Sequence, residues 1–474
     1  MIALMVVVFL IGYVLIALEH PIKINKAGIA LFIGTALWII YMYVAPQVVP
    51  HVSGDEFQHY ISTHPELKAE DYATQIREFV INSQILESIG DISETILFLL
   101  AAMAIVELID THGGFVYITD RIITRNKRKL FWLISFITFG MSAVLDNLTT
   151  TIVMVMLIRR IVPEPRERWL VGSMIVIAAN SGGAWSPIGD VTTIMLWVKG
   201  NITVLISPKL ILPSLVSMII PLMFLQFVLK GAIPQIRKSE TSENKAILKN
   251  FRRKDRLGIL AFGVSILVLA PVFKMITHLP PFVWLLFGMS MLWIYTEIIY
   301  NHKIGMKEDA KLRLSKVLGR LDIATLMFFL GILLAVDALQ SAGILGSLSG
   351  FIAEKMPNVY AQGISIGLLS AIIDNVPLVA AAIGMYPVVE AGAVSMASNP
   401  GFLQNFVVDG NFWHFLAYCA GVGGSILIIG SAAGVVFMGL EGVSFGWYLK
   451  RISLVTLVGY LAGAGVYMLQ QMLL

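Results

Sequence analysis

Repeated apolar stretches, each long enough to cross a lipid bilayer, constrain this chain more than any other feature of its sequence. A helix needs about 20 mostly apolar residues to span a hydrocarbon core of roughly 30 Å. Such stretches recur along the 474 residues, for example over Ile211 to Val228 and Leu257 to Val272. Hydrophobic residues make up 57% of the chain and charged residues only 14%, where a soluble domain usually carries about a quarter. We therefore predict an all-α polytopic membrane protein with about eleven to thirteen crossings or half-crossings.

Several other kinds of protein are excluded by what the sequence lacks. It holds no GxxxxGK[ST] phosphate loop and no HExxH zinc motif, and its 8 His are scattered. Cys419 is the only cysteine, so neither a disulfide framework nor a thiolate metal cluster is predicted. The basic residues lie in connections beside apolar stretches, so the net charge of +4 indicates no nucleic-acid partner. We expect no cofactor, and the lipid bilayer as the surroundings of the protein.

The charges of the connections predict how the chain is oriented. The segment from His51 to Asp91 is rich in Asp and Glu, and it holds only one Lys and one Arg, Lys68 and Arg77. Four other connections are basic: Arg121 to Lys129, Arg159 to Arg168, Lys230 to Arg256 and His302 to Arg320. Because Lys and Arg are retained on the cytoplasmic side, we expect the acidic segment and the amino terminus outside. The expected location is the inner (plasma) membrane of a bacterial cell.

Two halves of the sequence resemble each other at three places in the same order. The stretch TILFLLAAMAIVELIDTHGG from Thr95 matches TLMFFLGILLAVDALQSAG from Thr325. Next, SAVLDNLTT from Ser142 matches SAIIDNVPL from Ser370, and NSGGAWSPIGDVTT from Asn180 matches GVGGSILIIGSAAG from Gly421. The first copy follows the acidic outside segment and the second follows a basic inside connection, so the copies enter the membrane from opposite faces. This arrangement predicts two inverted-topology repeats, as in many transporters.

The predicted organisation follows from these connections and repeats. The first stretch, Met1 to Leu18, lacks the basic leader and cleavage site of a secretory signal, so we expect it to remain as a membrane helix. The predicted segments are transmembrane helices 1–50, an extracytoplasmic acidic loop 51–93, a first inverted repeat 94–229, a cytoplasmic basic linker 230–256, connecting helices and a basic loop 257–320, and a second inverted repeat with the C-terminal helix 321–474.

Gly and Pro mark where the membrane helices should be interrupted. Inverted repeats place a substrate site near the bilayer midplane, at broken helices or re-entrant hairpins whose free backbone groups line a cavity. Such breaks are predicted over Asn180 to Gly189 and over Gly421 to Gly434. An ionised carboxylate in a membrane helix costs about 2.5–3.5 kcal/mol or more, which makes an intramembrane Asp a functional candidate. Asp146, Asp190 and Asp374 are the candidates near these stretches.

The sequence around the first of these acids suits a hard cation. Sodium prefers oxygen ligands. In the sequence DNLTTT, Asp146 is followed by the amide of Asn147 and by the hydroxyls of Thr149, Thr150 and Thr151. The alternative is that Asp146 caps a helix. Both roles are compatible if one carboxylate oxygen caps the helix and the other binds the ion. Asp190, which precedes Thr192 and Thr193, leaves the same two alternatives open.

The remaining acids are weaker candidates. Asp374 and Asn375 match the first Asp-Asn pair, yet apolar residues follow them, so direct ligation and a structural role in the second hairpin stay equally open. Glu107 and Asp337 occupy matched positions near the ends of their spans, where an interhelical role is the more ordinary one. His51, His59 and His64 share the acidic segment, and solvated side chains explain them better than a metal site does.

At DNLTT, SGGAWSPIGDVTT and the second Asp-Asn pair, the chain resembles the NhaD-type sodium/proton antiporters over nearly its whole length. These belong to an ion-transporter superfamily that also holds arsenite permeases and sodium/dicarboxylate carriers. The resemblance implies a scaffold domain that forms a homodimer, and a transport domain in which two hairpin tips meet two unwound helices at the ion. It implies the exchange of cytoplasmic Na⁺, and of Li⁺, for external H⁺ by alternating access.

The resemblance also carries a set of site residues onto this sequence. Sodium is expected at Asp146, Asn147 and Asp190, with the two Asp-Asn pairs at the hairpin tips. Together with the candidates that the residues themselves indicate, the full expected set of ion-binding residues is Asp146, Asn147, Thr149, Thr150, Asn180, Asp190, Thr192, Thr193, Asp374 and Asn375, with Ser370, Ser425, Ser431, Glu107 and Asp337 as secondary candidates.

Two other classes of function are weighed against exchange. A sodium-coupled anion symporter or anion permease of the same fold would need positive or donor-rich groups at the midplane, and the candidate stretches hold no Lys or Arg. Related anion carriers have Ser-Asn-Thr where this chain has Asp-Asn-Leu-Thr, and a carboxylate favours a cation. A membrane enzyme or receptor would need a nucleophile with a base, or a soluble domain, and neither is evident. We therefore predict a transporter and not an enzyme.

Overall fold

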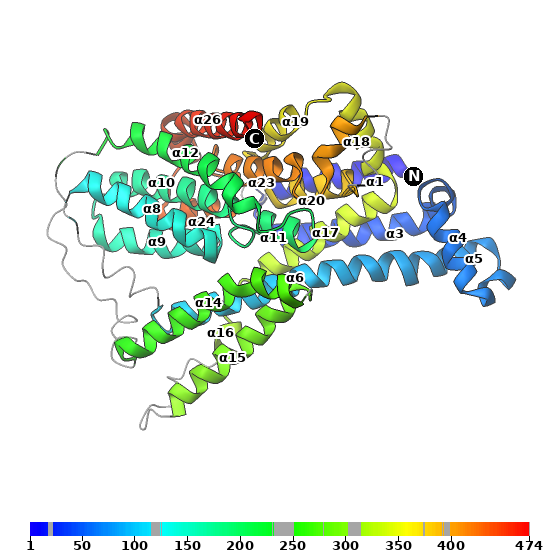
Figure 1. Cartoon of the computed structure of the whole chain (residues 1–474), viewed down its shortest axis with the longest axis horizontal. Helices are drawn as coiled ribbons and strands as arrows, with labels where there is room; N and C mark the ends of the chain where they lie inside the picture. Colours follow the sequence, from blue (N-terminus) through cyan, green and yellow to red (C-terminus); the bar gives the residue numbers. More distant parts are fainter. Residues whose placement is uncertain are drawn as a thin grey trace. The chain divides into compact units, whose positions relative to one another are not determined.

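The computed structural model is all-helical over the residues that it describes (Figure 1). These are residues 1–17, 22–114, 124, 126–229, 231, 251–277, 279–301, 314–372, 375–390, 392 and 399–473. Within them, 7 helical runs are long and apolar enough to cross a membrane: Lys26–Val52, Tyr72–Thr111, Lys127–Leu145, Ile206–Leu225, Pro281–Asn301, Ile323–Ser341 and Phe445–Leu473. Shorter apolar helices accompany them. The prediction of an all-α polytopic membrane protein is confirmed.

The chain divides into two compact units, and each is described by itself. Unit 1 comprises Met1–Ile96, Asp322–Val359 and Val376–Val407, and unit 2 comprises Leu97–Leu321, Tyr360–Asn375 and Val408–Leu474. Both units are therefore assembled from segments that lie far apart in the sequence. One boundary falls within the helix α6 (Leu86–Thr111) and another at the start of α20 (Asn375–Met385).

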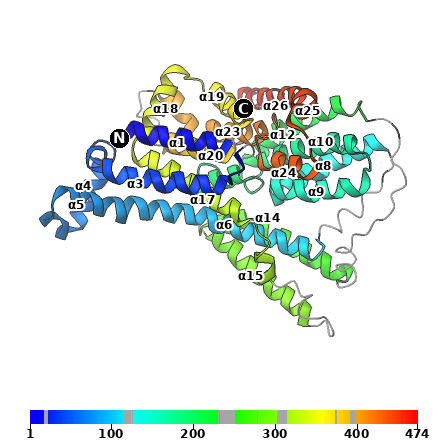
Figure 2. The same cartoon turned by 180° about the vertical axis from the view of Figure 1, so that it is seen from behind.

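In unit 1, three helices pack against one another: α1 (Ile2–Ala17), α3 (Lys26–Val52) and α17 (Ile323–Ser341) (Figure 2). The backbones of α3 and α17 touch at two glycines. A Cβ atom on Gly34 would overlap the carbonyl oxygen of Gly331, and one on Gly331 would overlap the backbone of Leu31. Small residues allow such close crossings in membrane proteins. The rest of the unit includes α18 (Ile344–Lys355), α22 (Pro400–Leu403) and the 3₁₀ turn η4 (Gln404–Phe406).

The acidic segment that we predicted as a loop over 51–93 is helical over most of its length. It forms α4 (Gly54–Thr63), the 3₁₀ turn η1 (Pro65–Ala69), α5 (Tyr72–Phe79) and the π-helical turn η2 (Val80–Ile85), and it then continues into α6. The rings of Phe57 and Tyr60 each pack against Phe79, with ring centres 5.5 Å apart in both pairs. These aromatic residues are spaced so that they face one another between short helices, which gives the charged segment a small core of its own.

Unit 2 is built around the buried helix α10 (Pro165–Ala184). Every residue of α10 from Leu170 to Ala184 is buried, and α10 contacts α8 (Lys127–Leu145), α9 (Asn147–Ile161), α12 (Ile206–Leu225), α23 (Asn411–Gly423) and α24 (Ala432–Glu441) (Figure 1). The helix α23 is likewise buried from Phe412 to Gly423. Two helices that have no exposed face in a membrane protein are positioned to line an internal site.

The remaining helices of unit 2 surround these two. They are α11 (Val191–Val198), α14 (Arg253–Thr277), α15 (Pro281–Asn301), α16 (Leu314–Leu318), α19 (Val359–Ser370), α25 (Phe445–Tyr448), the π-helical turn η5 (Leu449–Ser453) and α26 (Leu454–Leu473). The helices α14 and α15 pack against each other, and α12 packs against α26 (Figure 1). The helix α12 contains Pro213 and Pro221, which remove backbone hydrogen bonds inside it.

Candidate functional site

Two interruptions of the helices in unit 2 have the same local geometry. Residues 185–190 separate α10 from α11, and residues 424–431 separate α23 from α24; we call them the first and the second break. Asp190 caps α11 with φ −144° and ψ 152°, and Ser431 caps α24 with φ −144° and ψ 153°. The Asp190 carboxylate accepts a hydrogen bond from Thr192 N at 3.3 Å, and Ser431 Oγ accepts one from Gly434 N at 3.2 Å. Each short helix thus starts with a side-chain cap that is buried in the unit.

Two serines hold these breaks in matching ways. Ser142 Oγ donates a hydrogen bond to the carbonyl oxygen of Ala179 at 2.6 Å, and Ser370 Oγ donates one to that of Ala420 at 2.8 Å. In the aligned stretches, Ser142 corresponds to Ser370 and Ala179 to Ala420. The serines lie near the end of α8 and at the end of α19, so each fastens a helix end to the helix that precedes a break.

Glycines allow the same pairs of segments to approach closely. A Cβ atom on Gly182 would overlap the carbonyl oxygen of Phe139, and one on Gly423 would overlap that of Gly367. The two pairs correspond in the aligned stretches of the two halves, where Gly182 matches Gly423 and Phe139 matches Gly367. Backbone contact of this kind leaves no room for any side chain, so these positions require glycine.

The carboxylate of Asp190 is the centre of a buried polar network. Asn147 Nδ2 donates a hydrogen bond to Asp190 Oδ2 at 3.0 Å, and Asn375 Nδ2 lies 3.4 Å from the same oxygen. Asp190 is 1% exposed, Asn147 is 5% exposed and Asn375 is 4% exposed. The first residue of α9 and the first residue of α20 therefore meet at one carboxylate, which belongs to the last residue of the first break.

Asn180 extends this network to the second break. Its Oδ1 accepts a hydrogen bond from Asn147 Nδ2 at 3.0 Å, and its Nδ2 donates to Ser425 Oγ and to Ser431 Oγ, each at 2.8 Å. All of these side chains are buried. Because the amide nitrogen of Asn180 faces two hydroxyls, its amide oxygen faces Asn147. The two breaks are thus joined by a continuous chain of amide, hydroxyl and carboxylate groups.

Unsatisfied hydroxyl groups lie close to this network in the sequence. The Oγ1 atoms of Thr150, Thr151 and Thr192 are buried and have no hydrogen-bond partner among the residues that the structure describes. A buried polar group without a partner costs about 1–3 kcal/mol. Thr150 follows Asn147 by three residues and Thr192 follows Asp190 by two residues, so two of these hydroxyls belong to residues that adjoin the network in the chain.

Asp146 caps α9 and does not hydrogen-bond to the network. Its Oδ1 accepts a hydrogen bond from Thr149 N at 2.7 Å, and its Oδ2 accepts one from Thr149 Oγ1 at 2.9 Å. Its φ of 81° is unusual for a residue other than glycine, and such strained conformations cluster at functional sites. Of the three residues predicted for sodium, the structure joins Asn147 and Asp190, and it places Asp146 next to them in the chain with its carboxylate turned to its own helix.

The other predicted residues have the following places. Thr193 Oγ1 donates to Asp190 O at 2.9 Å and so fixes the backbone of the cap. Glu107 Oε1 accepts a hydrogen bond from Thr111 Oγ1 at 3.1 Å, and Asp337, in unit 1, accepts one from Ser88 Oγ at 2.6 Å between two helices. Asp374 lies outside the described residues.

One contributor was missed at the level of sequence. Ser142 fastens α8 to α10, yet it is not among the site residues predicted from the sequence, whereas its counterpart Ser370 is. The alignment of SAVLDN with SAIIDN held the signal, since the two serines stand at the same place in it.

No group of three or more His, Cys, Asp or Glu side chains that could hold a metal ion occurs within the described part of the chain.

Membrane-spanning helices with two capped breaks and a buried oxygen-rich network between them define a multi-pass membrane transporter. Comparison with known proteins agrees with this class. The family model described as "Citrate transporter" matches residues 13–401. The chain is 41% identical over 467 residues to sodium/proton antiporter 1 of Arabidopsis thaliana, which covers 98% of this chain and 72% of that protein.

Two further relatives extend the comparison. Sodium/proton antiporter 2 of Arabidopsis thaliana is 38% identical over 467 residues, which covers 98% of each protein. The Na⁺/H⁺ antiporter NhaD of Vibrio parahaemolyticus is 29% identical over 391 residues, with 78% of this chain and 87% of that protein covered. The chain belongs to the citrate transporter family, and within it to the group of proteins that are named sodium/proton antiporters. The resemblance to NhaD-type antiporters is confirmed, and the protein is a transporter rather than an enzyme.

Proposed function

We propose that this protein exchanges Na⁺ for H⁺ across a membrane and binds the cation at the oxygen-rich network around Asp190. The observation that carries the proposal is the buried Asp190 carboxylate, whose Oδ2 accepts hydrogen bonds from Asn147 and from Asn375. The relatives that cover most of the chain are named sodium/proton antiporters, which supports the same ions.

The chemistry of the network fits a small hard cation. Sodium prefers oxygen ligands, and the network offers the carboxylate of Asp190, the amide oxygen of Asn180 and the unpartnered hydroxyls of Thr150 and Thr192. Li⁺ has the same preference and is part of the proposal. Asp146 would join the ligands if its carboxylate turned away from Thr149, and the second Asp-Asn pair, Asp374 and Asn375, would close the site from the other half.

Exchange follows from burying a carboxylate. An ionised carboxylate inside a membrane protein is costly unless its charge is offset. Either Na⁺ or H⁺ offsets the charge of Asp190, and the two cannot occupy the same oxygens together. Movement of the loaded site from one side to the other therefore exchanges one ion for the other, and no cofactor is needed for this reaction.

We further infer that the chain consists of two inverted-topology repeats, over 94–229 and 321–474, each with a re-entrant hairpin and a broken helix. The matching caps of Asp190 and Ser431 and the matching hydrogen bonds of Ser142 and Ser370 support this inference. The helices over 1–50 would then belong to the scaffold of a homodimer. The segments 51–93 and 230–256 would lie on opposite sides of the membrane.

The proposed orientation has the amino terminus outside and the basic connections in the cytoplasm. Na⁺ would leave the cytoplasm as H⁺ enters it, and the proposed location is the inner membrane of a bacterial cell. The Lys/Arg bias of the connections supports the orientation. Relatives from Vibrio support a bacterial membrane, while relatives from a plant share the same family.

The second candidate function is sodium-coupled anion transport, because the matching family model carries the name of a citrate transporter. The geometry favours a cation. The amide nitrogens of Asn147, Asn180 and Asn375, which an anion would need as donors, face Asp190 or serine hydroxyls. An anion at this place would also meet the charge of Asp190.

The experiment that separates the two functions uses the purified protein in proteoliposomes with an acidic interior. We expect added Na⁺ or Li⁺ to release protons from the lumen, and citrate to change neither the rate nor the extent. Sodium-dependent uptake of citrate without release of protons by Na⁺ alone would reject exchange in favour of anion transport.

A further inference from the structure

A buried carboxylate lies at the far end of α24, away from the network. Glu441 is the last residue of this helix, and its side chain is 1% exposed. A negative charge at a helix C-terminus is unfavourable, because the helix dipole is itself negative there. Burial adds a further cost unless the charge is paired. The position therefore holds a carboxylate only because other groups compensate it.

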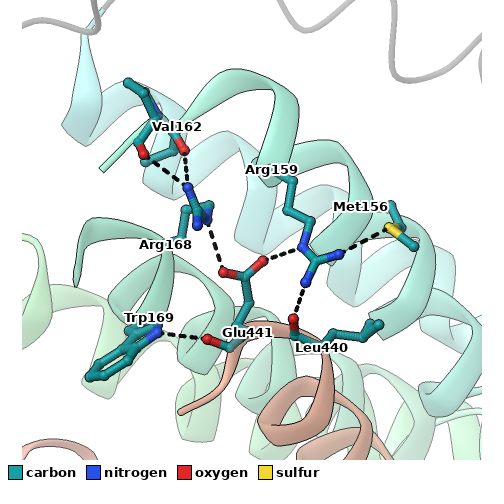
Figure 3. A network of polar contacts seen from close by, with 8 residues as sticks. Met156, Arg159, Val162, Arg168, Trp169, Leu440 and Glu441 are labelled. Atoms are coloured by element: carbon teal, nitrogen blue, oxygen red, sulfur yellow. Dashed lines mark hydrogen bonds and ion pairs between the residues drawn. The ribbon is translucent and has the colours of Figure 1, made fainter. Parts of the chain in front are cut away.

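Two arginines from α9 and α10 supply this compensation (Figure 3). Arg159 Nε lies 2.6 Å from Glu441 Oε1, and Arg168 Nε lies 2.8 Å from Glu441 Oε2. Arg159 also donates to the carbonyl oxygen of Leu440, and Trp169 Nε1 donates to that of Glu441 at 3.0 Å. The end of α24 is thus fastened to α9 and α10 through both its side chain and its free carbonyl groups.

The opposite end of α24 belongs to the candidate ion site. Ser431, the cap of the helix, accepts a hydrogen bond from Asn180 Nδ2 at 2.8 Å, and this bond keeps Asn180 Oδ1 toward Asn147. The helix between Ser431 and Glu441 has 10 residues, which corresponds to about 15 Å. Because a short helix moves as one body, a displacement of its last residue also displaces its first. The ion pairs of Glu441 therefore affect the position of Ser431.

A corresponding contact occurs in the connection between α11 and α12, five residues after α11 ends. Asp409, just before α23, accepts hydrogen bonds from Thr203 N at 2.7 Å and from Thr203 Oγ1 at 2.6 Å. Asp409 corresponds to Arg168 when the alignment of Asn180 with Gly421 is extended. The end of α24 therefore contacts the start of α10, and the connection after α11 contacts the residue just before α23. In both cases the contact joins the segment after one break to the start of the long helix that precedes the other break.

We propose that Glu441 is a positioning residue for cation binding. Its ion pairs with Arg159 and Arg168 hold α24 so that Ser431 orients Asn180, and Asn180 in turn orients Asn147 toward Asp190. Glu441 itself does not touch the ion. The inference rests on the proposed exchange of Na⁺ for H⁺, and it assigns to that exchange a residue at the opposite end of α24 from the site.

The test compares Glu441→Gln with Glu167→Gln in proteoliposomes. Gln keeps the size of the side chain and removes its charge. Glu167 forms an ion pair of 2.6 Å with Lys127, which joins α10 to α8 and does not involve α24. For Glu441→Gln we expect the half-saturating Na⁺ concentration to rise about threefold to thirtyfold, the range for a remote residue coupled to a site. For Glu167→Gln we expect a change within about twofold.

Further variants separate positioning from folding. Arg159, whose side chain is 38% exposed, can be replaced by Gln while Arg168 stays on Glu441. Arg159→Gln should raise the half-saturating concentration less than Glu441→Gln does, and the double variant should be no worse than Glu441→Gln alone. The conservative variant Glu441→Asp should restore part of the affinity. If Glu441→Gln does not fold, Arg159→Gln and Glu441→Asp can each be compared with the wild type and with Glu167→Gln, and a raised half-saturating concentration in Arg159→Gln still supports the inference.

The result that overturns the inference is distinct from failure of the proposed function. If the wild-type protein releases no protons on addition of Na⁺, the exchange itself is rejected. If the wild type exchanges Na⁺, and Glu441→Gln and Arg159→Gln have the half-saturation of Glu167→Gln, Glu441 is not a positioning residue. A fall in thermal stability alone would then identify the ion pairs as a structural link between helices.

Discussion

The side-chain nitrogen of Asn147 lies 3.0 Å from Asp190 Oδ2, and this hydrogen bond joins the start of α9 to the break between α10 and α11. Asn147 uses the same nitrogen to reach Asn180 Oδ1, also at 3.0 Å. Residues from distant parts of the sequence thereby form one buried network. Its carboxylate and amide oxygens are the reason for expecting a cation at this place.

Replacing Asp190 by Asn should abolish Na⁺-dependent exchange, because the variant loses the charge that offsets dehydration of the cation. Asn keeps the size and the helix-capping ability of Asp, so the protein should still insert and remain folded. Proton release by Na⁺ in proteoliposomes measures the effect. Wild-type exchange in this variant would remove Asp190 from the site.

Asp71 offers a matched control for that substitution. It caps α5 on the exposed acidic segment, and the hydrogen bond from the Thr74 hydroxyl lowers the pKa of its carboxyl group. With its pKa lowered in the folded state, the ionised cap stabilises the segment above the ordinary carboxyl pKa, and this contribution is lost only as the pH falls through the lowered pKa. Asp71→Asn removes this local contribution at neutral and alkaline pH. Because Asp71 lies in unit 1 and caps only α5, exchange should nevertheless stay unchanged.

Asp146→Asn separates the two roles that remain for Asp146. Asn caps helices as well as Asp does and tolerates the positive φ of 81°. If Asp146 only caps α9, exchange should persist in the variant. We expect instead that exchange is abolished while the thermal stability changes little, because the proposed site includes the Asp146 carboxylate once it has turned away from Thr149. The paired measurement of transport and unfolding temperature decides between a cap and a ligand.

The positions of the connections can be tested by cysteine labelling. In a Cys419→Ser background, a cysteine at position 66 should react with an impermeant reagent added from outside. Cysteines at Lys245 and Lys311, both outside the described residues, should react only after the membrane is opened. Labelling of position 245 from outside would contradict the orientation and with it the inverted topology of the repeats.

Much of the fold and part of the site follow from the sequence. Apolar length predicts the membrane helices. The Gly and Pro residues over Asn180 to Gly189 predict a break there, and the structure has one over residues 185–190, because α10 continues through Asn180 and both glycines to Ala184. The direction of the Asp146 carboxylate does not follow, since the same DNLT sequence serves a cap or a ligand. In the structure, both carboxylate oxygens of Asp146 accept hydrogen bonds from Thr149.

Other features depend on partners that the sequence does not mark. Glu441 meets Arg168 across 273 positions of the chain, and nothing in the residues around Glu441 identifies that partner. The helices within 51–93 were obscured for a different reason. Their many charged residues indicate a solvated connection, while the apolar contacts of Phe57 and Phe79 form only when α4 and α5 pack together.

The central claim is that Na⁺ and H⁺ compete for one carboxylate-containing site. The most direct measurement is the half-saturating Na⁺ concentration in proteoliposomes from about pH 6 to about pH 9.5, with internal and external pH kept equal. Competition predicts that this concentration falls as the pH rises, because fewer sites hold a proton, and that it levels off once the site is deprotonated. If Asp146 and Asp190 share the site, the titration belongs to the pair. A half-saturating concentration that is constant over this range would contradict the account, and would place the proton and the cation at separate sites.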